Sequence, residues 1–338
     1  MRNPCSRSTT VEPLMKNANQ FARTGKNSER SNSIFGYFIQ GLKDHGKYPW
    51  DFISATATAF STSIKSTWPS SNDIKILASC DQGILICKRR IPFNNQFFAC
   101  KPATAQWQAL PNPKLHYETV ASAVVVLQSQ PLRYLIARLY CTVVQTHCEM
   151  FDSESWRWEE MDCAPLSVGD FINSYPPITT AGRFVHWLTW SNKVVTLDVK
   201  KRCFECWVLP ERVRSKEKRL VEHDGGLGLM CQVQDADEIE LWANQMVVRI
   251  KADMDNPTRF CNNNVIFMTT VDADGGAFYY LSNSTFTKVK LPSHLGYPYR
   301  FYQRIFPFKS DINTVHLKPL SISKIVKQDS ESSVLSNY

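Results

Sequence analysis

No long hydrophobic run occurs in the 338 residues. The longest purely apolar run, Ala123 to Leu127, has five residues, whereas a helix that crosses a bilayer needs about 20. The first residues also lack the apolar stretch of a secretory signal. We therefore expect no membrane partner, and a location in the cytoplasm and/or the nucleus.

The chain also lacks the even number of cysteines that a set of disulfides requires. The chain has 11 cysteines, and without a secretory signal the expected compartment is reducing, where thiols stay free. We therefore predict no disulfide framework. Cys80 and Cys87 lie seven residues apart across an expected turn, and we interpret both as small apolar residues of the core.

The chain has no concentrated charge of one sign. Lys and Arg total 39 and Asp and Glu total 31, a net charge of +8. Residues 1–33 carry about half of that excess, with six bases and two acids. The densest basic run, Arg212–Arg219, is predicted to be a solvated loop. A nucleic-acid-binding face usually needs a denser basic cluster, so nucleic acid is a disfavoured partner.

The two ends of the chain have few residues able to form a core. Residues 1–33 contain 14 Ser, Thr, Asn or Gln and only four large apolar residues. Such a composition cannot bury enough surface to offset the entropy of ordering. We predict a disordered polar segment over 1–33, one domain over 34–320 and a disordered tail over 321–338.

The middle of the chain follows a strand, turn, strand pattern with little helical periodicity. Ile74–Ala78 and Ile84–Cys87, for example, flank a turn that contains Asp81 and Gly83. Many short strands separated by Gly, Asn, Asp and Pro indicate an all-β sandwich or propeller. The other expected hairpins are Phe97–Trp107, Phe184–Leu188 with Val194–Val199, Leu227–Val233 with Ile239–Trp242, and Val265–Val271 with Ala277–Leu281.

A weak repeat favours the propeller. Four expected strand ends resemble one another, with an apolar fourth residue at positions 110, 161, 209 and 291. The intervals are 51, 48 and 82, the last being about twice 41, and propeller blades recur every 40 to 50 residues or so. We predict a β-propeller-like domain of about five to six blades, with a β-sandwich as the alternative. The four units are Trp107–Pro111, Trp158–Asp162, Cys206–Pro210 and Lys288–Pro292.

The order of several motifs resembles a known family. Ile76–Cys87, followed by Phe98–Pro111, resembles the plant F-box-associated pattern "SCNGLLLC" and "NPATKQWxxLP". Together the similar segments cover roughly residues 33 to 310, and the chain resembles the F-box/kelch-like type of F-box-associated (FBA) domain protein. The further matching segments are Ser33–Phe38, Cys148–Trp158, Gly182–Leu188, Val195–Val199 and Ile239–Trp242.

The resemblance implies a β-propeller that performs protein–protein interaction. A complete family member is the substrate receptor of a Skp-cullin-F-box (SCF) E3 ubiquitin ligase, in the ubiquitin-like conjugation pathway, and recruits a protein target for ubiquitination. It implies no enzyme activity, no cofactor and, as partners, a protein substrate with a Skp-type adaptor and cullin. The chain departs from the family at Gln82 and Lys101, where Asn is usual, and residues 1–33 show no F-box leucine pattern. The alternative is an F-box-less binding protein that is not coupled to ubiquitin transfer.

No motif predicts catalysis or a metal. Neither Gly-x-Ser-x-Gly nor His-Glu-x-x-His occurs, and Cys203 with Cys206 supplies only half of a zinc site. Glu159 and Glu160 are adjacent in an expected strand, so their side chains point to opposite faces. The sequence therefore assigns no catalytic, metal or cofactor residue and no target-binding residue, and a propeller-fold enzyme stays a less favoured alternative.

The remaining polar, glycine-rich and aromatic motifs have structural interpretations. His186 is interpreted as a strand residue, and the acidic and glycine-rich groups as turns. The four tryptophans of the strand patterns are predicted to bury their rings against a neighbouring sheet. The turn groups are Asp235, Asp237 and Glu238, and Asp272–Gly276, and the tryptophans are Trp107, Trp158, Trp187 and Trp242. Gly225–Gly228 lacks the spacing of a dinucleotide-binding motif. Asn283–Thr285 fits a glycosylation acceptor, which a chain that is not secreted does not use.

Overall fold

The computed structural model describes most of the domain between the two chain ends. Residues 1–33 and 321–338, predicted to be disordered, lie outside the described residues, so this prediction is not tested. The described residues are 34–41, 47–55, 73–80, 82–91, 94–114, 117–143, 145–173, 175–223, 225–233, 238–243, 246–251, 257–262, 265–270, 275–280, 284–291 and 304–318.

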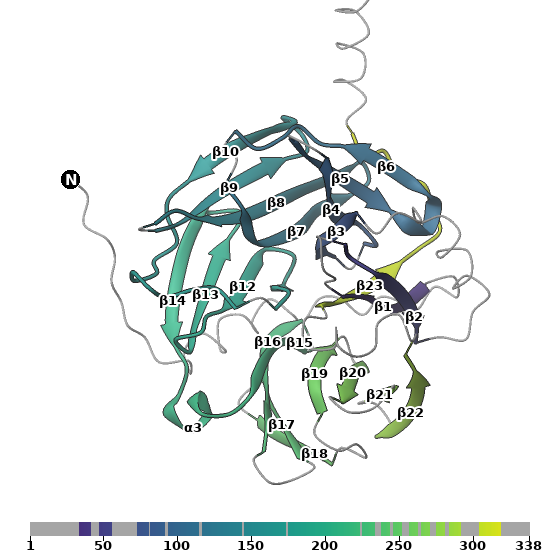
Figure 1. Cartoon of the computed structure of the whole chain (residues 1–338), viewed down its shortest axis with the longest axis vertical. Helices are drawn as coiled ribbons and strands as arrows, with labels where there is room; N and C mark the ends of the chain where they lie inside the picture. The colour runs from purple at the N-terminus through teal and green to yellow at the C-terminus, as the bar shows by residue number, and fades with distance from the viewer. Residues whose placement is uncertain are drawn as a thin grey trace, which may run out of the picture.

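Within these residues, 23 strands form six antiparallel sheets around a central axis (Figure 1). The chain is thus an all-β propeller of six blades, as predicted, and the sandwich alternative is wrong. Blade 1 is β3 (Ile74–Ser79), β4 (Leu85–Ile91), β5 (Asn94–Lys101) and β6 (Gln106–Ala109), and blade 2 is β7 (Thr119–Ser129), β8 (Leu132–Cys141), β9 (Thr146–Asp152) and β10 (Arg157–Met161). Blade 3 is β11 (Ile178–Thr180), β12 (Phe184–Leu188), β13 (Lys193–Asp198) and β14 (Cys203–Val208), and blade 4 is β15 (Lys218–His223), β16 (Gly226–Gln232), β17 (Glu238–Ala243) and β18 (Met246–Lys251). Blade 5 is β19 (Pro257–Asn262), β20 (Val265–Thr270), β21 (Gly275–Tyr280) and β22 (Thr285–Lys290), and the closing blade is β23 (Arg304–Ser310), β1 (Ile34–Gln40) and β2 (Trp50–Ser54).

The first strand of each blade lies innermost, and each inner strand lies beside the inner strand of the next blade, from β3 round to β23 and back. Because neighbouring strands of a sheet alternate in direction, the connections separate onto two faces. The turn face carries the turns after the first and third strands of each blade. The loop face carries the turns after the second strands and the ends of the fourth strands of blades 1 to 5.

Six hydrophobic clusters hold the ring together, one between each pair of neighbouring blades. A strand is therefore buried on both sides. In β7, Val124 packs in the cluster shared with blade 1, while Ala123 and Val125 pack in the cluster shared with blade 3. This double burial explains why short runs of consecutive apolar residues occur in an antiparallel fold, where alternation is the usual pattern.

The weak sequence repeat corresponds to the outermost strands. Leu110, Leu209 and Leu291 follow β6, β14 and β22 directly, and all three are buried. Met161 ends β10 and packs against the cluster between blades 2 and 3. The long interval of the repeat spans β18, the outermost strand of blade 4. The repeat thus reflects a buried residue at the place where the chain leaves one blade for the next.

The predicted hairpins are confirmed, including the turn at Pro102, which opens a 3-10 turn (η3, Pro102–Thr104) between β5 and β6. Only one α-helix, α3 (Glu211–Arg214), occurs in the described part of the chain. No helix among those residues is long and apolar enough to span a bilayer.

Cysteines and tryptophans are buried to different extents. The described cysteines are free thiols, and Cys87 is buried with its Sγ 3.6 Å from that of Cys100. Cys80 is only half-buried, because it follows β3 where the inner strands surround a cavity; its assignment to the core was therefore wrong in part.

Of the four tryptophans, Trp158 and Trp187 are buried and Trp107 and Trp242 are partly buried.

The closing blade joins the two ends of the domain. β1 pairs with β23 over seven residue pairs, from Ile34 opposite Ser310 to Gln40 opposite Arg304. On one side, the Tyr37 hydroxyl donates to the Val265 carbonyl of blade 5 at 2.5 Å. On the other side, the Gln40 amide bonds the backbone of Ile74 and Ile76 in β3, at 2.9 and 2.8 Å. β1 is therefore bound to both neighbouring blades as well as to its own.

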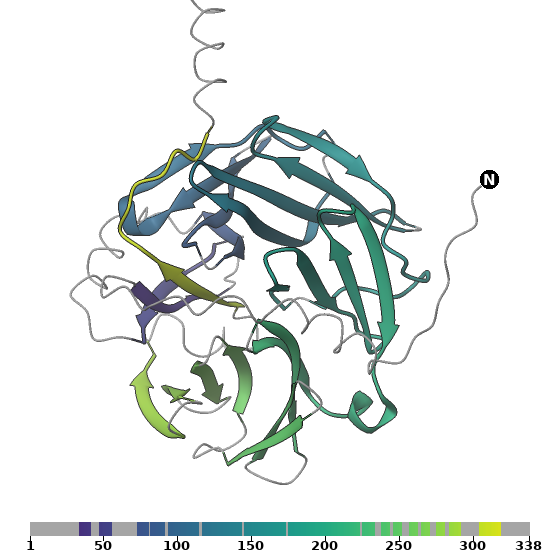
Figure 2. The same cartoon turned by 180° about the vertical axis from the view of Figure 1, so that it is seen from behind.

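The segment after β23 extends this closure. The buried Lys101 ammonium donates to the Asp311 carboxylate at 2.5 Å and to the Asn313 carbonyl at 2.7 Å. The Tyr134 hydroxyl donates to the Leu317 carbonyl at 3.0 Å. Figure 2 shows this segment, in yellow, running along the blue strands. Lys101, one of the two departures from the family pattern, thus fastens the C-terminal segment to blade 1.

The close approach of β1 to β2 gives a first testable prediction. A Cβ at Gly36 would lie 2.4 Å from the Ile53 carbonyl oxygen and 2.6 Å from the Phe52 ring. We expect Gly36→Ala to lower the free energy of unfolding by about 3 kcal/mol, because overpacking forces the closing blade apart. Urea unfolding measures the change. Gly169→Ala, whose Cβ meets nothing within 4 Å but whose φ is +84°, is the control, with a loss of about 1 kcal/mol. An equal or smaller loss for Gly36→Ala would contradict the described packing.

Candidate interaction face and central cavity

Exposed apolar side chains gather on the loop face of blades 2 and 3. Eight large hydrophobic residues are exposed in the described part of the chain, and six of them lie on this face. Exposed apolar side chains that share one face of a soluble protein indicate a candidate interaction site. We call these six residues the apolar loop patch: Tyr117, Val143, Val168, Phe171, Trp190 and Val208.

Phe171 and Trp190 belong to two loops that are joined to each other. The Trp190 amide donates to the Phe171 carbonyl at 3.0 Å, and the next pair, Ile172 and Thr189, forms a β-bridge. Lys193 Nζ lies 3.0 Å from Asp170 Oδ2, an ion pair that links the same loops. With the backbone held in this way, the side chains of Phe171 and Trp190 stay 56% and 66% exposed. The structure therefore displays two aromatic side chains on an ordered base.

Tyr117 is positioned by a buried charge network. Its ring stacks on Tyr140 with the centroids 5.5 Å apart and the planes at 2°. Beneath them, the Arg138 guanidinium donates to the Tyr117 carbonyl and pairs with the carboxylate of Glu149, and both of these charged side chains are buried. A buried ion pair of this kind holds one geometry, because breaking it leaves an uncompensated charge.

The basic run 212–219 connects blades 3 and 4, and the prediction of a solvated loop is right only in part, because Arg212 and Arg214 are exposed whereas Arg219 is buried. The run forms most of α3, a turn and the start of β15. The Arg212 guanidinium lies 4.1 Å above the Trp242 ring, and the Arg219 guanidinium, which is buried, lies 3.2 Å above the Tyr175 ring. Aromatic faces and carbonyls anchor this segment to the propeller.

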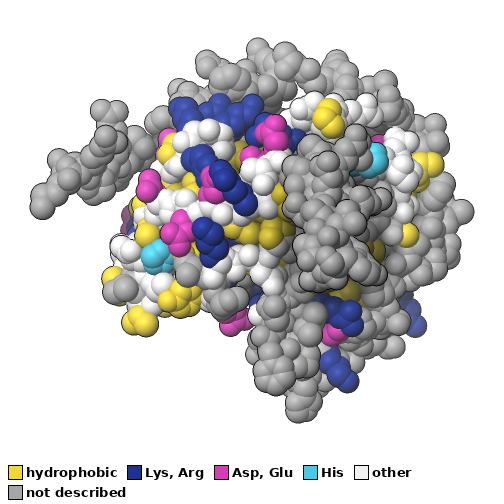
Figure 3. Space-filling view, turned by 90° about the horizontal axis from the view of Figure 1, so that it is seen from above, with side chains coloured by type: hydrophobic (Ala, Val, Ile, Leu, Met, Phe, Trp, Pro, Cys, Tyr) yellow, Lys and Arg dark blue, Asp and Glu magenta, His cyan; other side chains and the backbone are white. Residues whose placement is uncertain are grey.

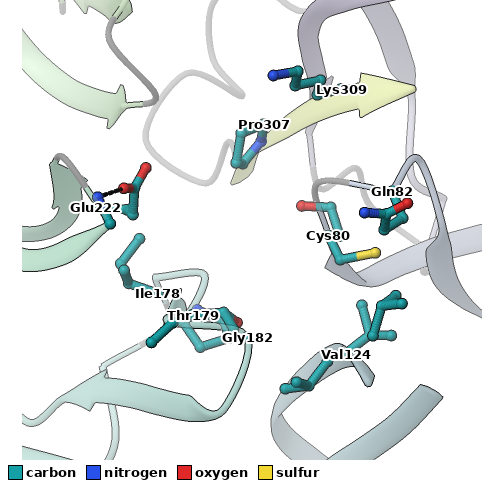
Figure 4. Close-up of a pocket in the computed structure, with 15 residues that line it drawn as sticks. Cys80, Gln82, Val124, Ile178, Thr179, Gly182, Glu222, Pro307 and Lys309 are labelled. Atoms are coloured by element: carbon teal, nitrogen blue, oxygen red, sulfur yellow. Dashed lines mark hydrogen bonds between the residues drawn. The ribbon is translucent and has the colours of Figure 1, made fainter. Parts of the chain in front are cut away.

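A cavity of about 440 Å³ lies in the central channel at the turn face. Its walls are the ends of the inner strands β3, β7, β11, β15 and β23, and its volume lies within the range of small-molecule sites. Figure 4 shows Glu222 and Lys309 on different sides of it, with the Glu222 carboxylate accepting a hydrogen bond from the Gly225 amide. Cys80, Gln82 and Thr179 supply further polar atoms.

The sequence-based candidates for catalysis have structural partners. His186 is buried in β12 between two hydroxyl groups, with Nε2 2.8 Å from Thr180 Oγ1 and Nδ1 2.7 Å from Thr196 Oγ1. Burial lowers its pKa to about 3. The Glu159 carboxylate, on the outermost strand β10, pairs with Arg157 and Arg202, and their hydrogen bonds lower its pKa. In the view onto the rim of the ring, basic and acidic side chains are interleaved (Figure 3).

The remaining candidates do not converge. Cys203 and Cys206 both lie in β14, the first exposed and the second half-buried. No cluster of three metal-ligating side chains occurs among the residues that the structure describes. Gly225 lies in the turn before β16, Gly226–Gly228 belong to β16, and Glu238 begins β17. Asp235, Asp237, Asp272–Asp274 and Asn283 lie outside the described residues.

The three aromatic residues of the patch, Tyr117, Phe171 and Trp190, were not predicted from the sequence. One signal was present, because Trp190 begins Trp-Ser-Asn-Lys between two strands. A tryptophan in a tight turn has no sheet to pack against, so it stays exposed or binds a partner.

The chain has relatives among plant F-box proteins. No family model matches it. It is 39% identical to the Arabidopsis thaliana F-box protein At5g41720 over 72 residues, which are 19% of this chain and 37% of that protein. It is 24% identical to the Arabidopsis thaliana F-box protein At5g03970 over 177 residues, 49% of this chain and 40% of that protein. The chain thus spans about two fifths of the length of these curated relatives.

One solved structure supports the fold. TolB from Acinetobacter baumannii is 10% identical, with a TM-score of 0.53 over 92% of this chain and 74% of that chain. The Swd1 β-propeller domain from Myceliophteria thermophila is 10% identical, with a TM-score of 0.43 over 79% of this chain and 88% of that chain. At 10% identity the likeness to TolB concerns the fold alone. The TM-score of 0.43 for the Swd1 domain is too low to support the fold further.

The buried His186 gives a prediction on pH. Its pKa is lowered in the folded protein, so between about pH 6.5 and pH 3 the unfolded chain binds a proton that the folded protein does not. The free energy of unfolding therefore falls as the pH falls through this window. We expect wild type to lose about 2 kcal/mol more than His186→Gln between pH 7 and pH 5. Urea unfolding at both pH values measures this difference. The control is the exposed His316→Gln, and equal losses in wild type and His186→Gln would contradict the description.

Proposed function

We propose that the chain is the target-binding domain of an F-box-type protein and holds a protein partner on the apolar loop patch for ubiquitin transfer. The observation that carries this proposal is the gathering of six exposed apolar side chains on one face, over loops fixed by backbone bonds and ion pairs. The relatives named as F-box proteins and the propeller fold support it.

In this role the domain performs no chemistry. It raises the concentration of the target near the ligase, while a Skp-type adaptor and a cullin bring the ubiquitin-transfer enzymes. A rigid ring with variable loops suits this task, because the loops can carry specificity while the sheets keep their geometry. The proposed location is the cytoplasm and/or the nucleus, where that machinery operates.

The patch residues predict which substitution separates target binding from adaptor binding. Large aromatic side chains at the centre of an interface often contribute about 2 kcal/mol or more each. We expect the double variant Phe171→Ser/Trp190→Ser to lose at least about 30-fold in target recovery, because it removes both rings and leaves the buried clusters intact. The measurement is affinity purification of the tagged full chain from plant cells, with quantitative mass spectrometry.

The control is Ile312→Ser, an exposed apolar residue just after β23, on the turn face. Wild type and this control should recover adaptor, cullin and target, and the double variant should recover only the first two. If adaptor and cullin are absent from the wild-type sample, the chain is a binding protein uncoupled from ubiquitin transfer. If the double variant recovers the same proteins as wild type, the patch is not the target site.

A further inference from the structure

We infer that the protein segment bound by the apolar loop patch carries acidic residues beside its apolar anchors, and that Arg212 and Arg214 receive them. This inference rests on the proposed function, because it names the chemistry of the partner for the same face.

The basic run lies against the Trp190 turn. Lys218 Nζ donates to Asn192 Oδ1 at 2.8 Å, and Asn192 is two residues from Trp190 in the same turn. The Leu209 amide, just before α3, donates to the Asn192 carbonyl at 2.8 Å. A partner segment bound over Trp190 therefore also contacts residues 209–218, which lie beside it.

Most charges in and beside this run are already paired. Lys216 Nζ lies 2.6 Å from Glu240, and Arg219 lies 2.6 Å from Glu217. On the loops of the patch, the Asp170 carboxylate is paired with Lys193. Two acids lie closest in sequence to Arg212 and Arg214. Glu217 is paired with Arg219, and Glu211 is exposed at the first position of α3.

Arg212 and Arg214 have no carboxylate partner among the described residues. Both are exposed. The Arg212 guanidinium carbon lies 4.1 Å from the centre of the Trp242 ring, and Arg214 donates from Nε to the Leu209 carbonyl at 2.9 Å. These contacts orient the two guanidinium groups, and among the described residues no carboxylate accepts from their other N–H groups. Such a pre-oriented fork matches a carboxylate in two parallel hydrogen bonds.

The surroundings favour a protein segment over nucleic acid. The patch includes three valines, which offer no stacking surface for a base, and single-stranded nucleic acid binding depends on stacking aromatic residues along a basic groove. Two arginines that pair with no carboxylate in the described part of the chain, beside apolar and aromatic anchors, fit a short segment with aromatic or aliphatic residues next to Asp or Glu. Electrostatic complementarity of this kind gives specificity and speeds association.

The test uses the purified full chain, without adaptor, as bait for a phage-displayed library of random 12-residue peptides. A parallel selection uses Phe171→Ala/Trp190→Ala. The peptide most enriched by wild type is then synthesised and its Kd measured by fluorescence anisotropy. It is measured for wild type, Arg212→Glu/Arg214→Glu, Arg214→Glu alone and the control Lys200→Glu/Lys201→Glu. The control residues lie in the β13–β14 turn, on the opposite face of the ring.

We expect wild type to enrich peptides with aromatic or aliphatic anchors and an excess of Asp and Glu, and the aromatic double variant not to enrich them. The Kd should rise at least about tenfold for the double charge reversal and less for Arg214→Glu alone, with the control within about twofold of wild type. Arg214→Glu keeps the test valid if loss of the Arg212 stack on Trp242 unfolds the double variant.

Three outcomes would overturn the inference. The selected peptides could be neutral or basic, the charge reversals could leave the Kd unchanged, or wild type could enrich nothing beyond the aromatic variant. Displacement of the peptide by a 20-nucleotide single-stranded DNA, with DNA binding lost in the charge-reversed variants, would assign the arginines to nucleic acid and also overturn it. The selection needs no ligase component, so absence of adaptor from the cellular purification leaves this result unaffected.

Discussion

The pairing of β1 with β23 is the interaction on which the rest of the structure depends. A propeller blade buries both of its faces only if a blade stands on each side, so an open ring leaves the two end blades half exposed. Here the first and last described strands of the chain form one blade, and that blade supplies Phe38, Phe308 and Tyr37 to the clusters it shares with blades 1 and 5. The hydrogen bonds of Gln40 and Tyr37 to both neighbours make the closure specific. Separation of this one pair of strands would therefore expose two of the six clusters at once.

A closed ring also explains how the loops can act as a surface. Each sheet is held from both sides, so the connections on the loop face begin and end at fixed points. The Phe171 and Trp190 loops add their own backbone bonds and an ion pair to that base, and Arg138 with Glu149 does the same below Tyr117. Exposed aromatic side chains on ordered loops lose little conformational freedom on binding. The fold thus leads directly to the proposed interaction face.

Much of the fold could be predicted from the sequence, because its signals lie within short segments of the chain. Turn residues mark each hairpin, and the repeated outer-strand ends mark the blades, because Leu110, Leu209 and Leu291 meet the same requirement for a buried residue. The closing blade could not be predicted in this way, since β1 and β23 are about 270 residues apart and neither carries the repeat. The apolar loop patch could not be predicted from the sequence for a related reason. Trp187 and Trp190 differ by three positions, yet one is in the core and the other is exposed, and only the position of the turn between β12 and β13 decides which.

Hydrogen exchange of the native protein, followed peptide by peptide, tests the central role of the closure most directly. If β1 and β23 close the ring cooperatively, the amides of Ile34–Gln40 and Arg304–Ser310 should exchange with the same opening free energy as the inner strands of blades 2 and 3, because opening the ring unfolds the whole domain. Exchange of these two strands at a markedly lower free energy, with blades 1 to 5 still protected, would show that the ring does not depend on them and would contradict the account.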